Sequence, residues 1–122
     1  LSQVTARLLG VRSIFTEREN GKMTLRRGFK VAPGEKVLIV EDIVTTGGSI
    51  KEVVDVVNEA KGDIVGIGLF VDRSGGKADF GVPKEKVYPL LHLTVPTYKP
   101  EECPLCKEGV PITERGSHHL KK

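Results

Sequence analysis

The sequence lacks tryptophan, and aromatic residues of all kinds make up only 5% of its 122 residues. Proteins that bind single-stranded nucleic acids stack the bases on aromatic side chains, and this chain has few such platforms to offer. It also lacks an apolar run of the roughly 18 residues that a membrane-spanning helix needs. We therefore expect neither a nucleic-acid partner nor a membrane-spanning segment.

Cysteine is scarce as well, with only Cys103 and Cys106 in a C-x-x-C arrangement. This is half of a zinc site, and His118 and His119 could complete it. Structural zinc sites usually place the two histidines about three to five residues apart, whereas these two are adjacent. A plain pair of thiols is favoured over a zinc site or a disulfide. No basic segment followed by an apolar segment opens the chain, so we expect a cytoplasmic protein.

A chain of 122 residues has room for one domain. Two continuous apolar segments, Val37–Val40 and Ile64–Val71, are typical of parallel strands that are buried on both faces. The segment between them has helical periodicity, so the sequence predicts an α/β fold with a Rossmann-like parallel sheet. We expect this core to occupy residues 1–96. Residues 97–122 are rich in proline, glycine and charge, and are expected to form an irregular tail.

The remaining elements follow from turn and capping signals. Asn20-Gly21 predicts a β-hairpin, and the pattern Ser49-x-x-Glu52 predicts a capping box at the start of the central helix. That helix should bury a stripe of apolar side chains and end at Gly62: Ile50, Val53, Val54, Val57 and Ala60. The other expected elements are a helix from Leu1 capped by Gly10, strands at Val11–Phe15 and Lys36–Val40, an extended segment at Met23–Val31, and an edge strand at Val87–Val95.

The segment that follows Val40 carries the strongest chemical signal. Glycines, hydroxyls and the first N–H groups of a helix together form a site for a phosphate, and this is the composition of Thr45 to Ser49. Glu41 and Asp42 would repel a phosphate, so they are expected to accept hydrogen bonds from sugar hydroxyls. The lysine of the nucleoside-triphosphate-binding loop is absent. The pattern therefore favours a ribose 5-phosphate over a nucleoside triphosphate.

A cluster of basic residues precedes this segment. Its members are Arg18, Lys22, Arg26, Arg27 and Lys30. Such a cluster suits a small phosphorylated ligand, although a solvated basic loop is the common alternative.

The string Val37 to Ser49, Val-Leu-Ile-Val-Glu-Asp-Ile-Val-Thr-Thr-Gly-Gly-Ser, resembles the signature of the type I phosphoribosyltransferases. Three further strings resemble the orotate phosphoribosyltransferases in particular: Glu17–Phe29, Asp72–Gly76 and Cys103–Pro111. Together these strings cover most of the chain. The resemblance implies the type I phosphoribosyltransferase fold with a flexible β-hairpin loop.

The resemblance also implies residue roles. The residues expected to bind phosphoribosyl diphosphate are Glu41, Asp42, Ile43, Val44, Thr45, Thr46, Gly47, Gly48 and Ser49. Asp42, with Glu41, would act on the developing oxocarbenium ion. Thr45 and Arg73 would bind orotate. Arg18 and Lys22 would act catalytically on the leaving diphosphate from a mobile loop, often across a homodimer. Mg²⁺ is the implied cofactor and would be held mainly by the substrate, so no metal-ligating residue is assigned.

The implied reaction transfers ribose 5-phosphate from phosphoribosyl diphosphate to orotate, giving orotidine 5'-phosphate and diphosphate in pyrimidine (UMP) biosynthesis. Two alternatives stay open: a non-catalytic regulator that binds phosphoribosyl diphosphate, and a purine or uracil salvage enzyme. Family members carry a substantial region before the helix at Leu1, including a loop that binds diphosphate. We therefore expect that these residues belong to a longer or truncated protein and that they are inactive alone.

Overall fold

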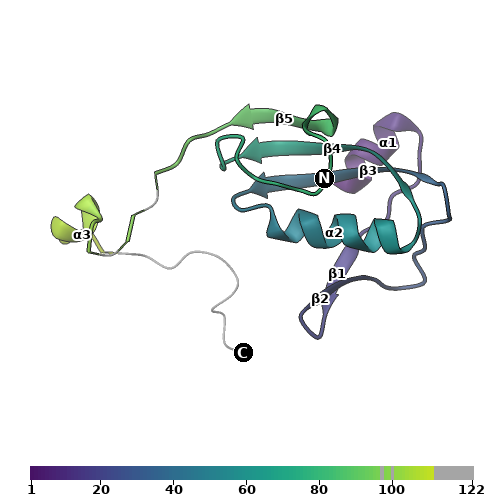
Figure 1. Cartoon of the computed structure of the whole chain (residues 1–122), viewed down its shortest axis with the longest axis horizontal. Helices are drawn as coiled ribbons and strands as arrows, with labels where there is room; N and C mark the ends of the chain where they lie inside the picture. Colours follow the sequence, from purple (N-terminus) through teal and green to yellow (C-terminus); the bar gives the residue numbers. More distant parts are fainter. Residues whose placement is uncertain (97, 100, 112–122) are drawn as a thin grey trace.

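The computed structural model describes residues 1–96, 98–99 and 101–111. Its centre is a three-stranded parallel sheet with the order β3-β4-β5, formed by Lys36–Val44, Asp63–Asp72 and Val87–His92. Helix α2, Gly48–Glu59, connects β3 to β4 and runs along the sheet (Figure 1). This arrangement confirms the predicted α/β fold with a parallel sheet.

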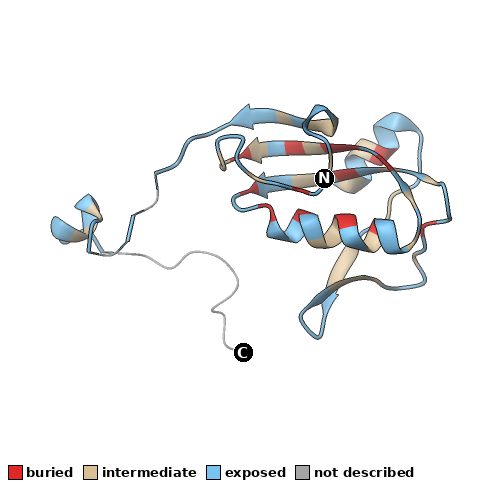
Figure 2. Cartoon of the chain, viewed as in Figure 1, coloured by how far each residue is buried: buried red, intermediate tan, exposed pale blue. Residues whose placement is uncertain are grey.

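The core lies between the sheet and α2. Ile67 and Leu69 of β4 are 0% and 2% exposed, and Ile50 and Val54 of α2 are 1% and 2% exposed. Burying each such side chain contributes about 1.5–3 kcal/mol. Figure 2 shows the buried positions concentrated in β4 and on the side of α2 that faces the sheet. The predicted stripe of α2 is therefore confirmed at Ile50, Val54 and Val57, whereas Val53 and Ala60 are half-buried and Ala60 is the C-cap. This packing holds the start of the helix beside the strand ends.

Helix α1, Ser2–Leu9, ends at Gly10, which adopts a left-handed conformation with φ of 66°. This confirms the expected glycine cap. Only Ala6 of this helix is buried, and Val4 and Leu8 are exposed. Two short elements complete the described chain: a 3₁₀ turn at Lys84–Lys86 (η1) and helix α3 at Pro104–Lys107.

The hairpin is formed by β1, Thr16–Glu19, and β2, Lys22–Leu25, which pair antiparallel. Asn20 and Gly21 both have positive φ, as the two central residues of a type I′ turn require, so the hairpin prediction is confirmed. The predicted strand at Val11–Phe15 is wrong, because this segment has no strand partner. Its apolar character instead serves packing, since the ring of Phe15 meets that of Phe29 edge to face at 5.1 Å.

Several predicted boundaries also needed correction. Strand β3 continues beyond Val40 to Val44 because β4 supplies hydrogen-bonding partners along that length. The extended segment from Met23 stops at Leu25, and a turn with positive φ at Arg27 and Gly28 follows. The edge strand β5 ends at His92, short of Val95.

The predicted capping box at Ser49 and Glu52 is wrong. The N-cap lies two residues earlier, at Gly47, and makes no side-chain capping bond. Glu52 instead accepts a hydrogen bond of 2.8 Å from Arg18 on the hairpin. At the other end the helix finishes at Glu59, and the left-handed residue is Lys61 instead of the expected Gly62. The N–H of Gly62 still donates to the carbonyl of Val57 at 2.9 Å, which completes the cap.

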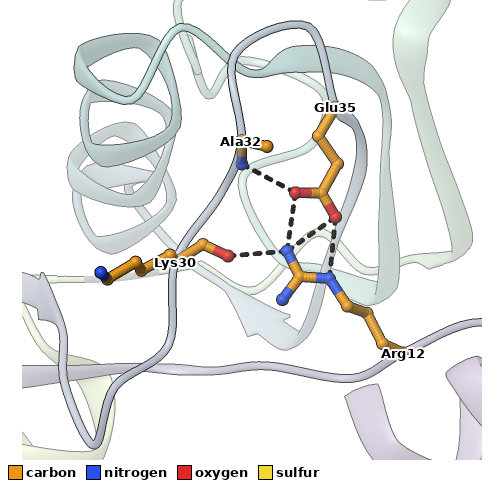
Figure 3. Close-up of polar contacts among 4 residues, drawn as sticks. All are labelled: Arg12, Lys30, Ala32 and Glu35. Carbon is orange, nitrogen blue, oxygen red and sulfur yellow. Dashed lines mark hydrogen bonds and ion pairs between the residues drawn. The ribbon is translucent and has the colours of Figure 1, made fainter.

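A polar cluster fixes the start of β3 (Figure 3). Arg12 donates from Nε and Nη2 to the two carboxylate oxygens of Glu35, at 2.8 and 2.7 Å, and from Nη2 to the carbonyl of Lys30 at 2.6 Å. The N–H of Ala32 donates to the same carboxylate at 2.8 Å. One carboxylate thereby joins the segment after α1 to the turn before β3.

This cluster should make stability depend on pH. The hydrogen bond from Ala32, followed by those from Arg12, lowers the pKa of Glu35 from its ordinary value of 4.5. A carboxyl with a lowered folded-state pKa stabilises the fold above its unfolded pKa and loses that contribution as pH falls through the folded value. The difference in Tm between wild type and Glu35→Gln should therefore be largest near neutral pH and shrink below pH 4.5. Thermal unfolding followed by circular dichroism across this range measures it.

The matched control is Glu101→Gln, which changes an exposed glutamate near α3. Its Tm difference from wild type should be small at every pH. A Glu35→Gln difference that does not change with pH would contradict the role of the Glu35 charge.

Candidate functional site

The loop between β3 and α2 encloses a small hollow of about 180 Å³. Its lining comprises Glu41, Ile43, Val44, Thr45, Thr46, Gly47, Gly48, Ser49 and Ile50. The structure thus brings together all the residues predicted to bind phosphoribosyl diphosphate except Asp42. The hollow lies at the N-terminus of α2, where free N–H groups and the helix dipole favour an anion.

Gly47 is required at this loop for two reasons. Its φ is 86°, in the left-handed region, and a Cβ at this position would lie 2.9 Å from the ring of Phe80 and 3.2 Å from Cβ of Ala78. Phe80 is only 5% exposed and belongs to the core. The support of the loop by Phe80 and Ala78 was missed from the sequence. A lone phenylalanine within a polar stretch was the available signal.

The two acids occupy the last part of β3. Glu41 is half-buried and Asp42 is exposed. Burial raises the pKa of Glu41, and the neighbouring Asp42 carboxyl raises it further, against the opposing effect of the hydrogen bond from the Asp42 N–H at 3.1 Å. Asp42 itself accepts from the N–H of Ile43 at 2.7 Å. Both side chains offer oxygen acceptors beside the hollow, which is the chemistry that sugar hydroxyls need.

A second, larger cavity of about 430 Å³ adjoins the first. Its lining comprises Thr45, Thr46, Arg73, Ser74, Gly75, Lys77, Ala78, Thr94 and Val95. Thr45 and Thr46 line both cavities, so the two are neighbours. The structure therefore brings Thr45 and Arg73 together as predicted for an orotate site. Lys77 and Thr94 also line this cavity and were not predicted, because their segments meet Thr45 only in the folded sheet.

The structure does not bring Arg18 and Lys22 to these cavities. Neither residue lines them. Arg18 forms an ion pair of 2.8 Å with Glu52 of α2 and donates to the carbonyl of Gly21 at 2.8 Å, so the hairpin is held against the helix. Catalytic roles for these two residues remain predictions that require the hairpin to move.

The other arginines of the hairpin region lie in exposed ion pairs. Arg27 pairs with Glu17 at 2.8 Å, and Arg26 pairs with Glu19 at 3.3 Å. The hydrogen bond from Arg27 lowers the pKa of Glu17. In the structure Arg26 and Arg27 therefore face solvent, which is the alternative to ligand binding that the sequence left open for the basic cluster.

Within the described part of the chain, no group of three or more histidine, cysteine or acidic side chains is placed to hold a metal ion. Cys103 and Cys106 are free thiols, and a hydrogen bond from the Cys106 backbone lowers the pKa of Cys103. His118 and His119 lie outside the described residues, so the zinc alternative stays untested. Among the helices described, none has the length and apolar character to cross a membrane.

The fold and site define an α/β domain with a glycine-containing strand–loop–helix hollow suited to a phosphorylated ligand. Residues 4–85 match the family model described as the phosphoribosyl transferase domain. The chain belongs to this family, which confirms the resemblance inferred from the Val37 to Ser49 string.

Individual relatives agree with this membership. The chain is 59% identical to the orotate phosphoribosyltransferase of Thermotoga maritima, over 99% of the chain and 63% of that protein. It is 56% identical to the orotate phosphoribosyltransferase of Desulforamulus reducens, over 98% of the chain and 61% of that protein. The chain thus spans slightly less than two thirds of the length of these relatives.

A solved structure is similar in fold. The adenine phosphoribosyltransferase of Thermoanaerobacter pseudethanolicus superposes with a TM-score of 0.55 and 19% identity, covering 75% of this chain and 61% of that one. This similarity supports the fold assignment alone.

Proposed function

We propose that these residues form the ligand-binding core of an orotate phosphoribosyltransferase, which transfers ribose 5-phosphate from phosphoribosyl diphosphate to orotate. The observation that carries the proposal is the pair of neighbouring cavities that share Thr45 and Thr46 in their linings. One has the composition of a phosphate and ribose site, and the other has Arg73 among its lining residues. The names of the two relatives support the same substrate.

The role that each residue would have in the reaction follows from the chemistry of its side chain or backbone. The N–H groups and hydroxyls of the β3–α2 loop would hold the 5-phosphate. Glu41 and Asp42 would accept hydrogen bonds from the ribose, and the Asp42 charge would stabilise the positive charge that grows on the sugar as the glycosidic bond breaks. Arg73 would hold the orotate carboxylate through two charge-assisted hydrogen bonds, which a neutral base cannot accept.

The leaving diphosphate needs positive charge that the two cavities do not provide in full. Arg18 and Lys22 would supply it when the hairpin closes, which requires the ion pair between Arg18 and Glu52 to break. Mg²⁺ would neutralise further charge on the diphosphate. Glu41 and Asp42 offer carboxylate oxygens to it, and the substrate oxygens would supply most of its ligands. We further propose a cytoplasmic homodimer in which the hairpin serves a neighbouring subunit.

The decisive experiment assays the complete polypeptide that carries these residues, hereafter the complete protein. Orotate consumption and orotidine 5'-phosphate formation should both require phosphoribosyl diphosphate and Mg²⁺. Adenine, hypoxanthine and uracil serve as competing bases, and their consumption in place of orotate would indicate a salvage enzyme. Tight binding of phosphoribosyl diphosphate without transfer to any of these bases would indicate a regulator.

A binding measurement separates the phosphate site from the base site. Phosphoribosyl diphosphate with Mg²⁺ should raise the Tm of the protein, because a ligand present at 100 times its Kd stabilises the folded state by about 2.7 kcal/mol. Orotate alone should raise it less, since the β3–α2 loop is one continuous segment whereas the larger cavity is assembled from three separate segments, Thr45–Thr46, residues 73–78 and Thr94–Val95. Differential scanning calorimetry measures both shifts. Absence of any shift with the first ligand, in a folded sample, would contradict the assignment of the β3–α2 loop.

A further inference from the structure

Asp72 is the one buried charged side chain in the part of the chain that the structure describes, with only 4% of its surface exposed. It is the last residue of β4 and directly precedes Arg73. A carboxylate removed from water is costly unless donors replace the lost hydration, so its partners indicate its purpose.

Those partners are the backbone of the loop that follows. The N–H of Ser74 donates to Oδ1 at 2.7 Å, and the N–H of Gly76 donates to Oδ2 at 3.1 Å. The Ser74 hydroxyl also contributes, and its oxygen accepts from the N–H groups of Lys77 and Ala78 at 3.1 and 3.0 Å. The loop therefore wraps around one carboxylate and one hydroxyl.

Two backbone hydrogen bonds fix the point at which the loop leaves β4. The N–H of Arg73 donates to the carbonyl of Val44 at 2.8 Å, and the N–H of Leu93 donates to the carbonyl of Asp72 at 2.8 Å. His92 on β5 approaches the carboxylate at 3.4 Å. Burial alone would raise the pKa of Asp72, but the hydrogen bonds from Ser74 and Gly76 and the nearby His92 outweigh it and lower the pKa. The ionised form that the loop needs is thus favoured.

The Arg73 guanidinium has no partner of this kind. None of the hydrogen bonds and ion pairs found among the described residues involves its side chain, and Arg73 is one of the residues that line the larger cavity, together with Ser74 and Gly75. Gly75 and Gly76 both have positive φ, so the loop holds a conformation that the buried carboxylate helps to specify. The hydrogen-bonded part of the loop and the Arg73 side chain are thus adjacent in sequence.

We propose that Asp72 is a positioning residue for orotate recognition: its carboxylate holds the loop 73–76 so that Arg73 faces the base cavity. The inference rests on the proposed function. It assigns to Asp72 no contact with substrate, and it predicts that loss of the carboxylate impairs the base site selectively.

Asp72→Asn keeps the size of the side chain but turns an amide N–H₂ toward a backbone donor, either Ser74 or Gly76. In the complete protein, KM for orotate should rise about tenfold, because the two hydrogen bonds from Arg73 depend on its placement. The Kd for phosphoribosyl diphosphate with Mg²⁺, measured by isothermal titration calorimetry, should change less than about twofold, since its site is a separate loop. Asp79→Asn is the matched control. This aspartate is exposed, caps the N–H of Gly81 at 3.0 Å and does not line the base cavity.

A double-mutant cycle distinguishes positioning from a general structural role. If Asp72 acts through Arg73, adding Asp72→Asn to Arg73→Ala should weaken orotate binding no further, whereas independent effects would multiply. Should Asp72→Asn fail to fold, Ser74→Ala is the alternative variant. It removes the hydroxyl that accepts from the N–H groups of Lys77 and Ala78, and it should raise KM for orotate in the same selective way. Multiplying effects in the cycle, or equal weakening of both ligands, would overturn the proposal. A wild-type protein that consumes no orotate would instead refute the proposed function itself.

Discussion

Asp42→Asn should lower the turnover number of the complete protein about 100- to 1,000-fold, the range found when a group that stabilises transition-state charge is removed. Asparagine keeps the oxygen that accepts from the N–H of Ile43 at 2.7 Å, so the local backbone should be retained. Asparagine lacks the negative charge that stabilises the positive charge growing on the ribose. Since that charge appears only in the transition state, KM for phosphoribosyl diphosphate should change far less than turnover.

Initial rates at saturating substrates measure the effect, and thermal unfolding verifies the fold. Asp55→Asn provides the control, because Asp55 is an exposed residue of α2 that lines neither cavity. Its turnover should match that of wild type. An Asp42→Asn protein with ordinary turnover would remove Asp42 from the catalytic residues and leave Glu41 as the only acidic candidate in the motif.

Gly47→Ala should destabilise the fold by about 2–5 kcal/mol. A residue with a side chain in the left-handed region costs roughly 1–2 kcal/mol, and overpacking adds about 1–3 kcal/mol. The overpacking arises because the new Cβ would lie 2.9 Å from the ring of Phe80. The same change should weaken binding of phosphoribosyl diphosphate, since the loop must shift away from its phosphate-binding conformation.

Urea denaturation measures the loss as a lower midpoint with an unchanged slope. Gly48→Ala is the matched control for stability. Gly48 has no positive φ, and the nearest atom to a Cβ added there would be Oγ1 of Thr46 at 3.8 Å, so the stability of this variant should be unchanged or slightly higher. Combining Gly47→Ala with Phe80→Leu should recover part of the steric cost and none of the backbone cost. A Gly47→Ala midpoint equal to that of wild type would show that the loop is not held as described.

The hollow of the β3–α2 loop was predictable because its residues are contiguous. A strand, a short loop and a helix bring Glu41 and the residues from Ile43 to Ser49 around one hollow through local geometry alone. The larger cavity was only half predictable. Arg73 was found through its resemblance to a family string, whereas Lys77 and Thr94 carry no signal in the sequence that relates them to Thr45.

The errors share a physical origin. Val11–Phe15 has the composition of a strand, but a strand needs a partner, and composition does not reveal whether one is nearby. Ser49 and Glu52 have the spacing of a capping box, yet the loop enters α2 through Gly47, and Glu52 pairs with Arg18 far away in the chain. In both cases a non-local contact overrode a local preference.

The sequence by itself determined the alternation of strands and helix, the buried stripe of α2, the hairpin turn at Asn20-Gly21 and the phosphate-type loop, because periodicity, turn chemistry and loop composition act over a few neighbouring residues. The tertiary structure alone decided that Asp72 is buried beneath the Arg73 loop, that Phe80 supports Gly47, and that Arg18 rests on α2 away from both cavities. These contacts depend on the order of strands in the sheet, and that order is set by the burial of apolar surface across the whole domain.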